Sequence, residues 1–432
     1  MLHYYSCFIR FVFLFFLMVS LTALGVAQPL SQSPNSHNPP YTKSIEVLHW
    51  WTSGGEAQAL NVIRNEMVSK GFLWKDSPIV GSDGLQQKRV LRARMSEKNP
   101  PDVVLTQYVP HFARSGFLET LDDIALEDNW QALIPEPLQH SMKYNGHWMA
   151  VPVNIQRFNW VWANKKIFTT LQLQPPQTFD ELIEVCKKIK QAGYIPFAHG
   201  GQAWQDEIFF ESILLSVGGV SLFNKALVEF DLNVLNSEKM VTVFERVAQI
   251  REFFDKDFIN RDWNLATSMI IHDKAAMQVM GDWAKGEFTK AHQLPNKEFL
   301  CFAFPDTRHI FLFATDFFGI LKAPKDQNKR SQHIFVRTLF DKPVQEKFNQ
   351  IKGSIPFRQD INMQHFDECS QQSKTDFNLA LKKQRVVEHM DMRLQEKRRN
   401  AVYTAIANAF HDHNLSAKDA AKAFLKAAQT TQ

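Results

Sequence analysis

Residues 49–56, His-Trp-Trp-Thr-Ser-Gly-Gly-Glu, combine side chains that could recognise a carbohydrate. They follow the β-type run 45–48, and a helical pattern begins at Glu56. Neighbouring strand residues point to opposite faces, so one of Trp50 and Trp51 can pack in a core while the other faces a cleft. An indole suits the apolar face of a sugar, a carboxylate accepts from its hydroxyls, and two glycines let a backbone approach a ligand closely. The alternative interpretation is that both tryptophans are core residues.

Strand and helix patterns alternate along the rest of the chain, which is typical of α/β folds with mainly parallel sheets. Because 432 residues exceed what one hydrophobic core serves, about 250–300 residues, we expect two lobes. Capping-box patterns predict helix starts at Thr178 and Ser416. The patterns predict helices at 56–70 and 85–97, strands at 103–105, 148–153, 160–164, 276–280 and within 310–321, and a mainly helical end from 387.

The N-terminal residues 1–27 have the pattern of a secretory signal peptide. Arg10 precedes a 14-residue apolar run, 11–24, and the small residues 25–27 offer a cleavage site. The run is short for a membrane span, which needs about 20 apolar residues, although a retained anchor is the alternative. Residues 28–43 are polar and rich in proline, which predicts a flexible leader. The sequence therefore predicts export.

Composition argues against several classes of function. The net charge of +4 falls to +3 without Arg10, and the basic residues are scattered apart from 397–399, so we expect no nucleic-acid partner. The 15 histidines are dispersed and no Cys-x-x-Cys occurs, so we expect no metal. There is no phosphate-binding Gly-x-x-x-x-Gly-Lys loop and no hydrolase motif, so we expect no cofactor and no enzyme.

Six motifs occur in a characteristic order along the chain. They are His-Trp-Trp-Thr-Ser-Gly-Gly-Glu (49–56), Trp-Lys-Asp (74–76), Ala-His-Gly-Gly-Gln-x-Trp-Gln-Asp (198–206), Arg-Asp-Trp-Asn-Leu-Ala-Thr (261–267), Met-Gly-Asp-Trp-Ala-Lys-Gly-Glu-Phe (280–288) and Lys-Gly-Ser-Ile-Pro (352–356). By these motifs the chain resembles bacterial periplasmic glucose/sugar-binding proteins of ABC importers, the extracellular solute-binding family 1 type. The resemblance implies a type II-like periplasmic binding protein fold, with two α/β lobes, a multi-crossing hinge and a ligand cleft between the lobes.

The resemblance also implies an organisation and a function. Residues 44–153 plus 313–357 would form the N-terminal lobe, and residues 154–312 plus 358–432 the C-terminal lobe. A monomeric periplasmic protein would capture a monosaccharide, glucose or a similar hexose, by lobe closure and deliver it to ABC permease membrane subunits. The alternatives are a binding protein for an oligosaccharide or polyol, a sensor that presents sugar to a chemoreceptor, and a secreted glycoside hydrolase. Nothing in the sequence marks the carboxylic acid of raised pKa that the hydrolase would need.

The family pattern places a sugar site on particular residues. Arg92 stands where relatives carry a lysine, and Leu105 stands where several relatives carry a glutamine, so both positions depart from the pattern. Relatives are also glycine-rich at 81–84. For each residue the alternative role is a core, helix-surface or structural one. The expected sugar-binding residues are Trp50, Trp51, Glu56, Arg92, Trp263, Asp316, Lys352 and His389, with Trp204, Gln205, Asp206, Asp282 and Trp283 as a second tier.

Three cysteines remain after the predicted processing. An oxidising compartment permits one disulfide, and the sequence alone does not choose the pair. The resemblance favours Cys301 with Cys369, because relatives carry cysteines in both contexts. Cys186 lies in a helical pattern as a small apolar residue.

Overall fold

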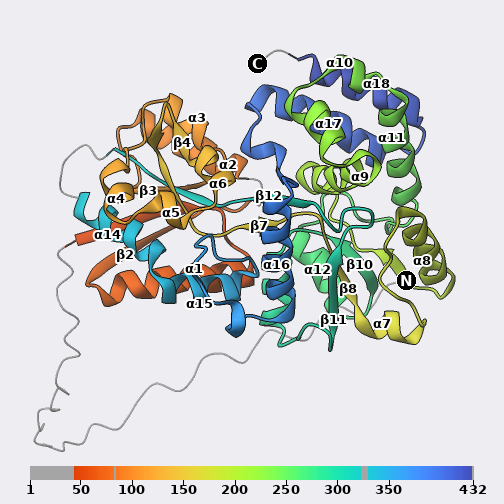
Figure 1. The fold of residues 1–432 in the computed structure, drawn as a ribbon, viewed down its shortest axis with the longest axis horizontal. Coiled ribbons are helices and arrows are strands. Elements are labelled where there is room, and N and C mark those ends of the chain that lie inside the picture. Colours follow the sequence, from red (N-terminus) through yellow and green to blue (C-terminus); the bar gives the residue numbers. More distant parts are fainter. Residues whose placement is uncertain (1–42, 82–83, 323–328, 431–432) are drawn as a thin grey trace, which may run out of the picture. The chain divides into compact units, whose positions relative to one another are not determined.

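A computed structural model describes residues 43–81, 84–322 and 329–430, which form two α/β lobes (Figure 1). The predicted signal peptide and residues 28–42 of the predicted leader lie outside the described residues. The predicted α/β class and two-lobe architecture are confirmed. No helix among the described residues is both long enough and apolar enough to cross a membrane.

The first lobe is built on a five-stranded sheet with the order β2-β1-β3-β13-β6. Strand β1 pairs in parallel with β2 and β3, whereas β13 pairs antiparallel with β3 and β6. The expectation of mainly parallel sheets is therefore wrong, because β13 enters this sheet from the other lobe and runs against its neighbours. The strands are β1 Lys43–His49, β2 Phe72–Pro78, β3 Val103–Thr106, β6 Ala150–Pro152 and β13 Phe317–Ile320, with a separate β4 Lys143–Tyr144 and β5 His147–Trp148 hairpin.

Helices α1 and α15 pack side by side (Figure 1), and α1 also packs against β2. The hydroxyl of Ser53 accepts from the backbone N–H of Glu56, which caps α1 directly after the tryptophan pair. The helices of this lobe are α1 Gly54–Ser69, α2 Leu85–Ser96, α3 Val109–Arg114, α4 Asp122–Glu127, α5 Trp130–Leu133, α6 Glu136–Met142, α14 Lys329–Phe340 and α15 Lys342–Lys352.

The second lobe has a four-stranded mixed sheet with the order β11-β8-β10-β9. The predicted capping box at Thr178 is present at the start of α8, and Ser416 caps α18. The strands are β8 Trp160–Asn164, β9 Ile195–Phe197, β10 Ala275–Val279 and β11 Phe299–Ala303. The helices are α7 Lys165–Thr170, α8 Phe179–Gln191, α9 Ala203–Phe223, the π-helix η1 Asn224–Val228, α10 Leu232–Leu235, α11 Glu238–Arg251, α12 Trp263–Ile271, α13 Ala284–Lys290, α17 Glu396–His411 and α18 Ala417–Ala428.

A third sheet, β14-β12-β7, joins the parts of the chain that pass between the lobes. Strand β7 (Gln156–Arg157) follows β6 of the first lobe, and β12 (Phe311–Ala314) leads directly to β13. A bridge between Ile155 and Ile355 places the segment after α15 beside these strands. Strand β14 (Val386–Glu388) pairs in parallel with β12 and is followed by the short helix η4 (Met390–Met392).

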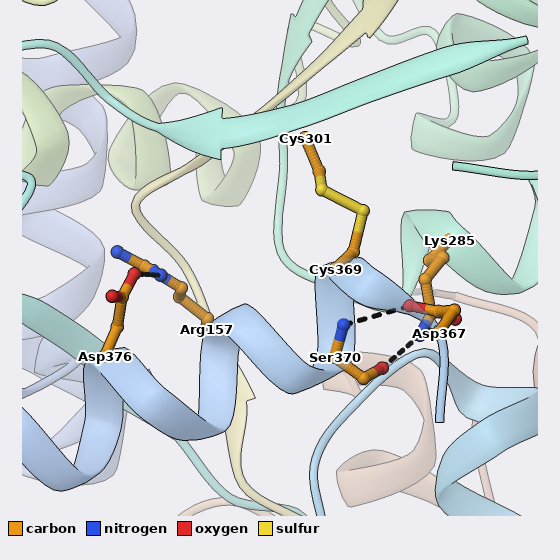
Figure 2. The surroundings of a disulfide bond; sticks show 7 residues. All are labelled: Arg157, Lys285, Cys301, Asp367, Cys369, Ser370 and Asp376. Atoms are coloured by element: carbon orange, nitrogen blue, oxygen red, sulfur yellow. Dashed lines mark hydrogen bonds and ion pairs between the residues drawn. A yellow bond between two sulfur atoms is a disulfide. The ribbon is translucent and has the colours of Figure 1, made fainter. Parts of the chain in front are cut away.

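Helix α16 (Glu368–Lys382), which follows the short helix η3 (Met363–His365), is fixed to its neighbours at three points (Figure 2). Cys369 forms a disulfide with Cys301 of β11, so the predicted pairing is present. Lys285 of α13 forms a 2.6 Å ion pair with Asp367 at the helix start. The buried guanidinium of Arg157 forms a 2.6 Å ion pair with Asp376. Covalent and ionic contacts therefore hold α16 to β11, α13 and β7.

Candidate functional site

One cavity, with about 710 Å³ of empty space that is partly open to solvent, collects most of the predicted site residues. The residues that line it come from both lobes and from the segments between them. The predicted residues in its wall are Trp50, Trp51, Glu56, Trp204, Trp263, Trp283, Asp316, Lys352 and His389.

Both tryptophans that follow β1 line the cavity. Trp51 is 1 % exposed and packs against Phe318 and Phe348 with ring centroids 5.6 Å apart in each pair. Trp50 lies against Gly84, where a Cβ atom would come within 3.0 Å of the indole. Gly84 also has a φ of +67°, so any side chain there would be strained as well as crowded. Each of the two indoles is therefore held in place by packing against its own neighbours.

The two glycines of the first motif contact protein rather than the cavity. The backbone of Gly286 occupies the space where a side chain of residue 55 would lie. An added Cβ at Gly55 would come within 2.8 Å of the carbonyl carbon of Gly286. The N–H of Gly55 donates to a carboxylate oxygen of Glu287 at 2.8 Å. The expected close approach to a ligand is therefore replaced by a close approach between helices α1 and α13.

Glu56 and Lys352 form a buried ion pair in the cavity wall. The Nζ of Lys352 lies 2.8 Å from Oε1 of Glu56, and the two side chains are 2 % and 12 % exposed. The same Nζ lies 5.3 Å from the ring centroid of Trp51 and 5.9 Å from that of Trp283. The ammonium group is therefore positioned by one carboxylate and by two aromatic faces.

Asp316 lies between β12 and β13, where the chain re-enters the first lobe. Gln107 donates to its Oδ1 and Asn154 donates to its Oδ2, each at 3.0 Å. The backbone N–H of Asp316 donates to Oδ1 of Asn154 at 2.9 Å. Two amides thus orient the carboxylate, whose oxygens together can accept about four hydrogen bonds and so retain capacity for a ligand hydroxyl.

Three indoles of the second lobe lie together in the cavity wall. Trp263 meets Trp283 edge-on at 6.4 Å, and Trp204 lies 6.2 Å from Trp283. The carbonyl of Trp263 accepts from the Thr267 hydroxyl at 3.0 Å and from the Gln278 amide at 3.1 Å. These bonds fix the start of α12 and therefore the position of the Trp263 ring.

His389 reaches the cavity from the end of β14. Its Nδ1 lies 2.7 Å from a carboxylate oxygen of Glu211 on α9, and its ring centroid lies 4.3 Å from that of Phe158. Burial lowers the pKa of His389, but the carboxylates of Glu211, Asp391 and Glu388 together outweigh burial, and the pKa is raised. Burial and the neighbouring Glu211 raise the pKa of Glu207 well above its ordinary value.

Within the described part of the chain, Glu207, Glu211 and His389 are the arrangement nearest to a metal-ligand set, with possible ligand atoms within 4.8 Å of one another. Two of these atoms, Nδ1 of His389 and Oε2 of Glu211, are already hydrogen-bonded to each other. Helix α9 and the residue after β14 therefore meet through a histidine–carboxylate pair. The hydrogen bond between His389 and Glu211 therefore explains why these side chains lie close together.

Arg92 lies outside the cavity lining. Its side chain is 54 % exposed and forms a 2.6 Å ion pair with Glu396 at the start of α17. Lys88, one helical turn earlier on α2, lines the cavity instead. The charge that the family pattern places at Arg92 is therefore supplied to the cavity by Lys88.

Three second-tier residues are buried behind the wall rather than in it. Gln205 donates to the carbonyl of Arg261 at 2.9 Å. Asp206 lies 2.7 Å from the ring nitrogen of His199, and Asp282 accepts from the backbone N–H of Arg157 at 2.9 Å. These residues brace the segments that carry the wall.

Several lining residues were not predicted from the sequence. Gln107 and Tyr108 directly follow β3, and the end of a strand beside the tryptophan-bearing β1 is a signal that could have found them. Leu105 is fully buried, and the amide expected at that position comes from Gln107 instead. The complete set is Lys88, Gln107, Tyr108, Gln156, Phe158, Asp391 and Arg399.

Asp282 predicts a pH dependence of stability. Burial raises its pKa to about 8. The folded state therefore binds a proton that the unfolded state releases near its ordinary pKa of 3.8, so this contribution to stability is full at low pH and is lost as pH rises through about 8. In Asp282→Asn this decline should disappear, because the amide is neutral throughout. Denaturant unfolding at pH 5, 7 and 9 measures it, and an unchanged decline in the variant would contradict the assignment.

Known proteins match this chain in sequence and in fold. The family described as bacterial extracellular solute-binding protein matches residues 77–326. A "probable sugar-binding periplasmic protein" of Brucella suis is 37 % identical over 422 residues, covering 96 % of this chain and 99 % of that protein. A protein of Rhizobium meliloti with the same name is 40 % identical over 337 residues, covering 77 % of this chain and 81 % of that protein. The structure of maltose-bound T. maritima MalE3 has a TM-score of 0.75 at 16 % identity and covers 89 % of this chain and 99 % of that chain.

Proposed function

Because the chain belongs to the bacterial extracellular solute-binding protein family, we propose that it is the periplasmic sugar-binding component of an ABC importer. The observation that carries the proposal is a single cavity lined by five indoles and by buried charged side chains from both lobes. The names of the Brucella and Rhizobium relatives support the same class of ligand and the same compartment.

The wall has the two chemical properties that a sugar requires. Indoles cover the apolar C–H faces of the ring, and Glu56, Asp316 and Lys352 meet its hydroxyls. Hydrogen bonds to ionised groups contribute roughly 1.5–3 kcal/mol each. A few such bonds with stacking reach micromolar affinity, which corresponds to about −8 kcal/mol.

The ligand that we propose is a monosaccharide, glucose or a similar hexose. Ion pairs and backbone contacts lie next to the lining residues: Arg92 with Glu396 beyond Lys88, and Gly55 with Gly286 beside Glu56. These contacts limit the space around the lining residues, which favours a small ligand. The maltose-bound neighbour favours a second candidate, an oligosaccharide. Isothermal titration calorimetry of the mature protein with glucose, galactose, xylose, maltose and maltotriose separates the two candidates.

Closure of the two lobes is the proposed mechanism. In this proposal residues 44–153 plus 313–357 move against residues 154–312 plus 358–432, and the strands β7 and β12 carry the hinge. A sugar that contacts Trp51 from one lobe and Trp263 from the other stabilises the closed form by its added contacts. The loaded monomer then docks on the permease. Export through residues 1–27 places it in the periplasm, and it catalyses no reaction.

Trp263→Ala is expected to weaken sugar binding by about 2 kcal/mol, or roughly thirtyfold, because a stacking face of the ring is lost. Calorimetry below the melting temperature of the variant measures the loss. Trp263→Leu retains apolar volume without a flat ring, so it should bind almost as weakly while melting closer to the wild type. Trp74→Ala, on β2 and outside the cavity, serves as the control for removing an indole. Wild-type affinity in Trp263→Ala would show that the site is misplaced.

A further inference from the structure

A buried hydrogen-bonded group lies directly behind the cavity at His389. Glu207 and Glu211 stand one turn apart on α9 and are both 0 % exposed. His389 is 3 % exposed and is both a cavity-lining residue and a neighbour of this pair. The group therefore connects helix α9 to the ligand pocket through one imidazole ring.

The contacts of Glu211 determine the state of that ring. One carboxylate oxygen accepts from the backbone N–H of Met390 at 3.0 Å, and the other lies 2.7 Å from Nδ1 of His389. An ionised carboxylate only accepts, so Nδ1 must carry the proton of this bond. Nε2 is then the remaining polar atom of the ring, and within the described residues it has no hydrogen-bond partner.

We propose that Glu211 is a positioning residue that fixes His389 so that Nε2 points into the pocket and contacts a sugar hydroxyl. The proposal rests on the proposed function and deepens it. Packing of the ring at 4.3 Å from Phe158 limits its tilt, while the bond to Glu211 sets which nitrogen carries hydrogen. The tilt of the imidazole ring and the nitrogen that carries its hydrogen are therefore both fixed before a ligand binds.

Glu207 differs from Glu211 although both carboxyl groups are buried. The nearer carboxyl oxygen of Glu207 lies 3.5 Å from Nδ1 of His389, whereas that of Glu211 lies 2.7 Å from the same atom. Burial and the neighbouring Glu211 raise the pKa of Glu207, which favours the neutral form of its carboxyl group. Glutamine at position 207 therefore preserves both shape and charge, whereas glutamine at position 211 preserves shape alone.

Other charged groups around the ring must be considered for any dependence on pH. Glu388 and Asp391 belong to the same segment as His389 and raise its pKa together with Glu211. Arg399 of α17 and Lys88 of α2 act on Asp391, whose pKa is lowered although its burial opposes this. Because these groups remain in a Glu211 variant, a change in pH profile reports the loss of the Glu211 charge.

The test compares Glu211→Gln with the matched control Glu207→Gln in the full mature chain. Glucose, or the sugar that binds best, is titrated by calorimetry from pH 5 to pH 9. Glu211→Gln should weaken binding by about tenfold or more, as loss of a partner that orients a ligating histidine does. Its pH profile should shift to lower pH, because His389 loses the carboxylate that raises its pKa. Glu207→Gln should stay within about twofold of the wild type, with an unshifted profile.

Nitrogen-15 NMR of His389 in the unliganded protein gives a second readout. The wild type should carry hydrogen on Nδ1 across the pH range, whereas Glu211→Gln should show a mixture of neutral tautomers. Equal losses of affinity in both variants, an unchanged pH profile in Glu211→Gln, or a stoichiometric bound metal that EDTA removes with loss of the Nδ1 signal would overturn the proposal. If the wild type binds no sugar, the proposed function fails, and identical tautomers in the wild type and Glu211→Gln then overturn the positioning role as well.

Discussion

Lys352→Met should destabilise the protein by about 3–5 kcal/mol, because it leaves the carboxylate of Glu56 buried without its partner. The two side chains are 2 % and 12 % exposed and lie 2.8 Å apart, so water can replace the lost ammonium only in part. The same variant should also lose sugar affinity, since Nζ lies in the cavity wall beside Trp51 and Trp283. Guanidinium unfolding followed by tryptophan fluorescence measures the stability.

The double variant Glu56→Gln/Lys352→Met distinguishes a broken ion pair from a packing defect. With both charges removed, its loss of stability should be smaller than that of Lys352→Met alone. Lys347→Met, on the same helix but exposed, should change stability by no more than about 0.5 kcal/mol. If the double variant loses as much stability as Glu56→Gln and Lys352→Met lose together, the two charges are not coupled.

Removal of the Cys301–Cys369 disulfide is expected to lower stability by about 4 kcal/mol. The sequence separation of 68 residues makes the closed loop long, and the loop-entropy relation gives this magnitude. The bond also joins β11 to α16, so the ion pairs Lys285–Asp367 and Arg157–Asp376 would have to hold that helix without it. Thermal unfolding of Cys301→Ser/Cys369→Ser against the oxidised wild type provides the measurement.

Reduction supplies the matched control for this prediction. Dithiothreitol should lower the melting temperature of the wild type toward that of the double serine variant and leave the variant itself unchanged. Cys186 is free and buried, and burial raises the pKa of its thiol, so it should not contribute. If complete reduction leaves the melting temperature of the wild type unchanged, the prediction is wrong.

The predicted residues that line the cavity belong mostly to local sequence motifs. Trp50, Trp51 and Glu56 follow a strand and open a helix, so their neighbourhood determines their placement. Arg92, which the family pattern favoured, lies outside the cavity lining for a different reason. Helical periodicity gives Lys88 and Arg92 the same face, but only the three-dimensional position of α17 decides which of them reaches the cavity and which meets Glu396.

The wrong predictions about the fold have a similar origin. The existence and approximate bounds of α1, α2, β8 and β10 follow from periodicity within each segment. The direction of β13 in its sheet does not, because it depends on where the chain returns from the second lobe. Likewise, the role of Gly55 depends on α13, a helix more than 200 residues away, whose Gly286 occupies the space that a side chain would need.

The place of β13 in the first sheet has a consequence for the order in which the protein can mature. Residues 317–320 fill the position between β3 and β6, although β6 ends at Pro152. A chain that emerges from its N-terminus must therefore carry an incomplete sheet, with unpaired edges at β3 and β6, until some 170 further residues have been delivered. During that interval the unpaired edges can pair with other chains, so the insertion of β13 removes this risk at β3 and β6 only late in synthesis.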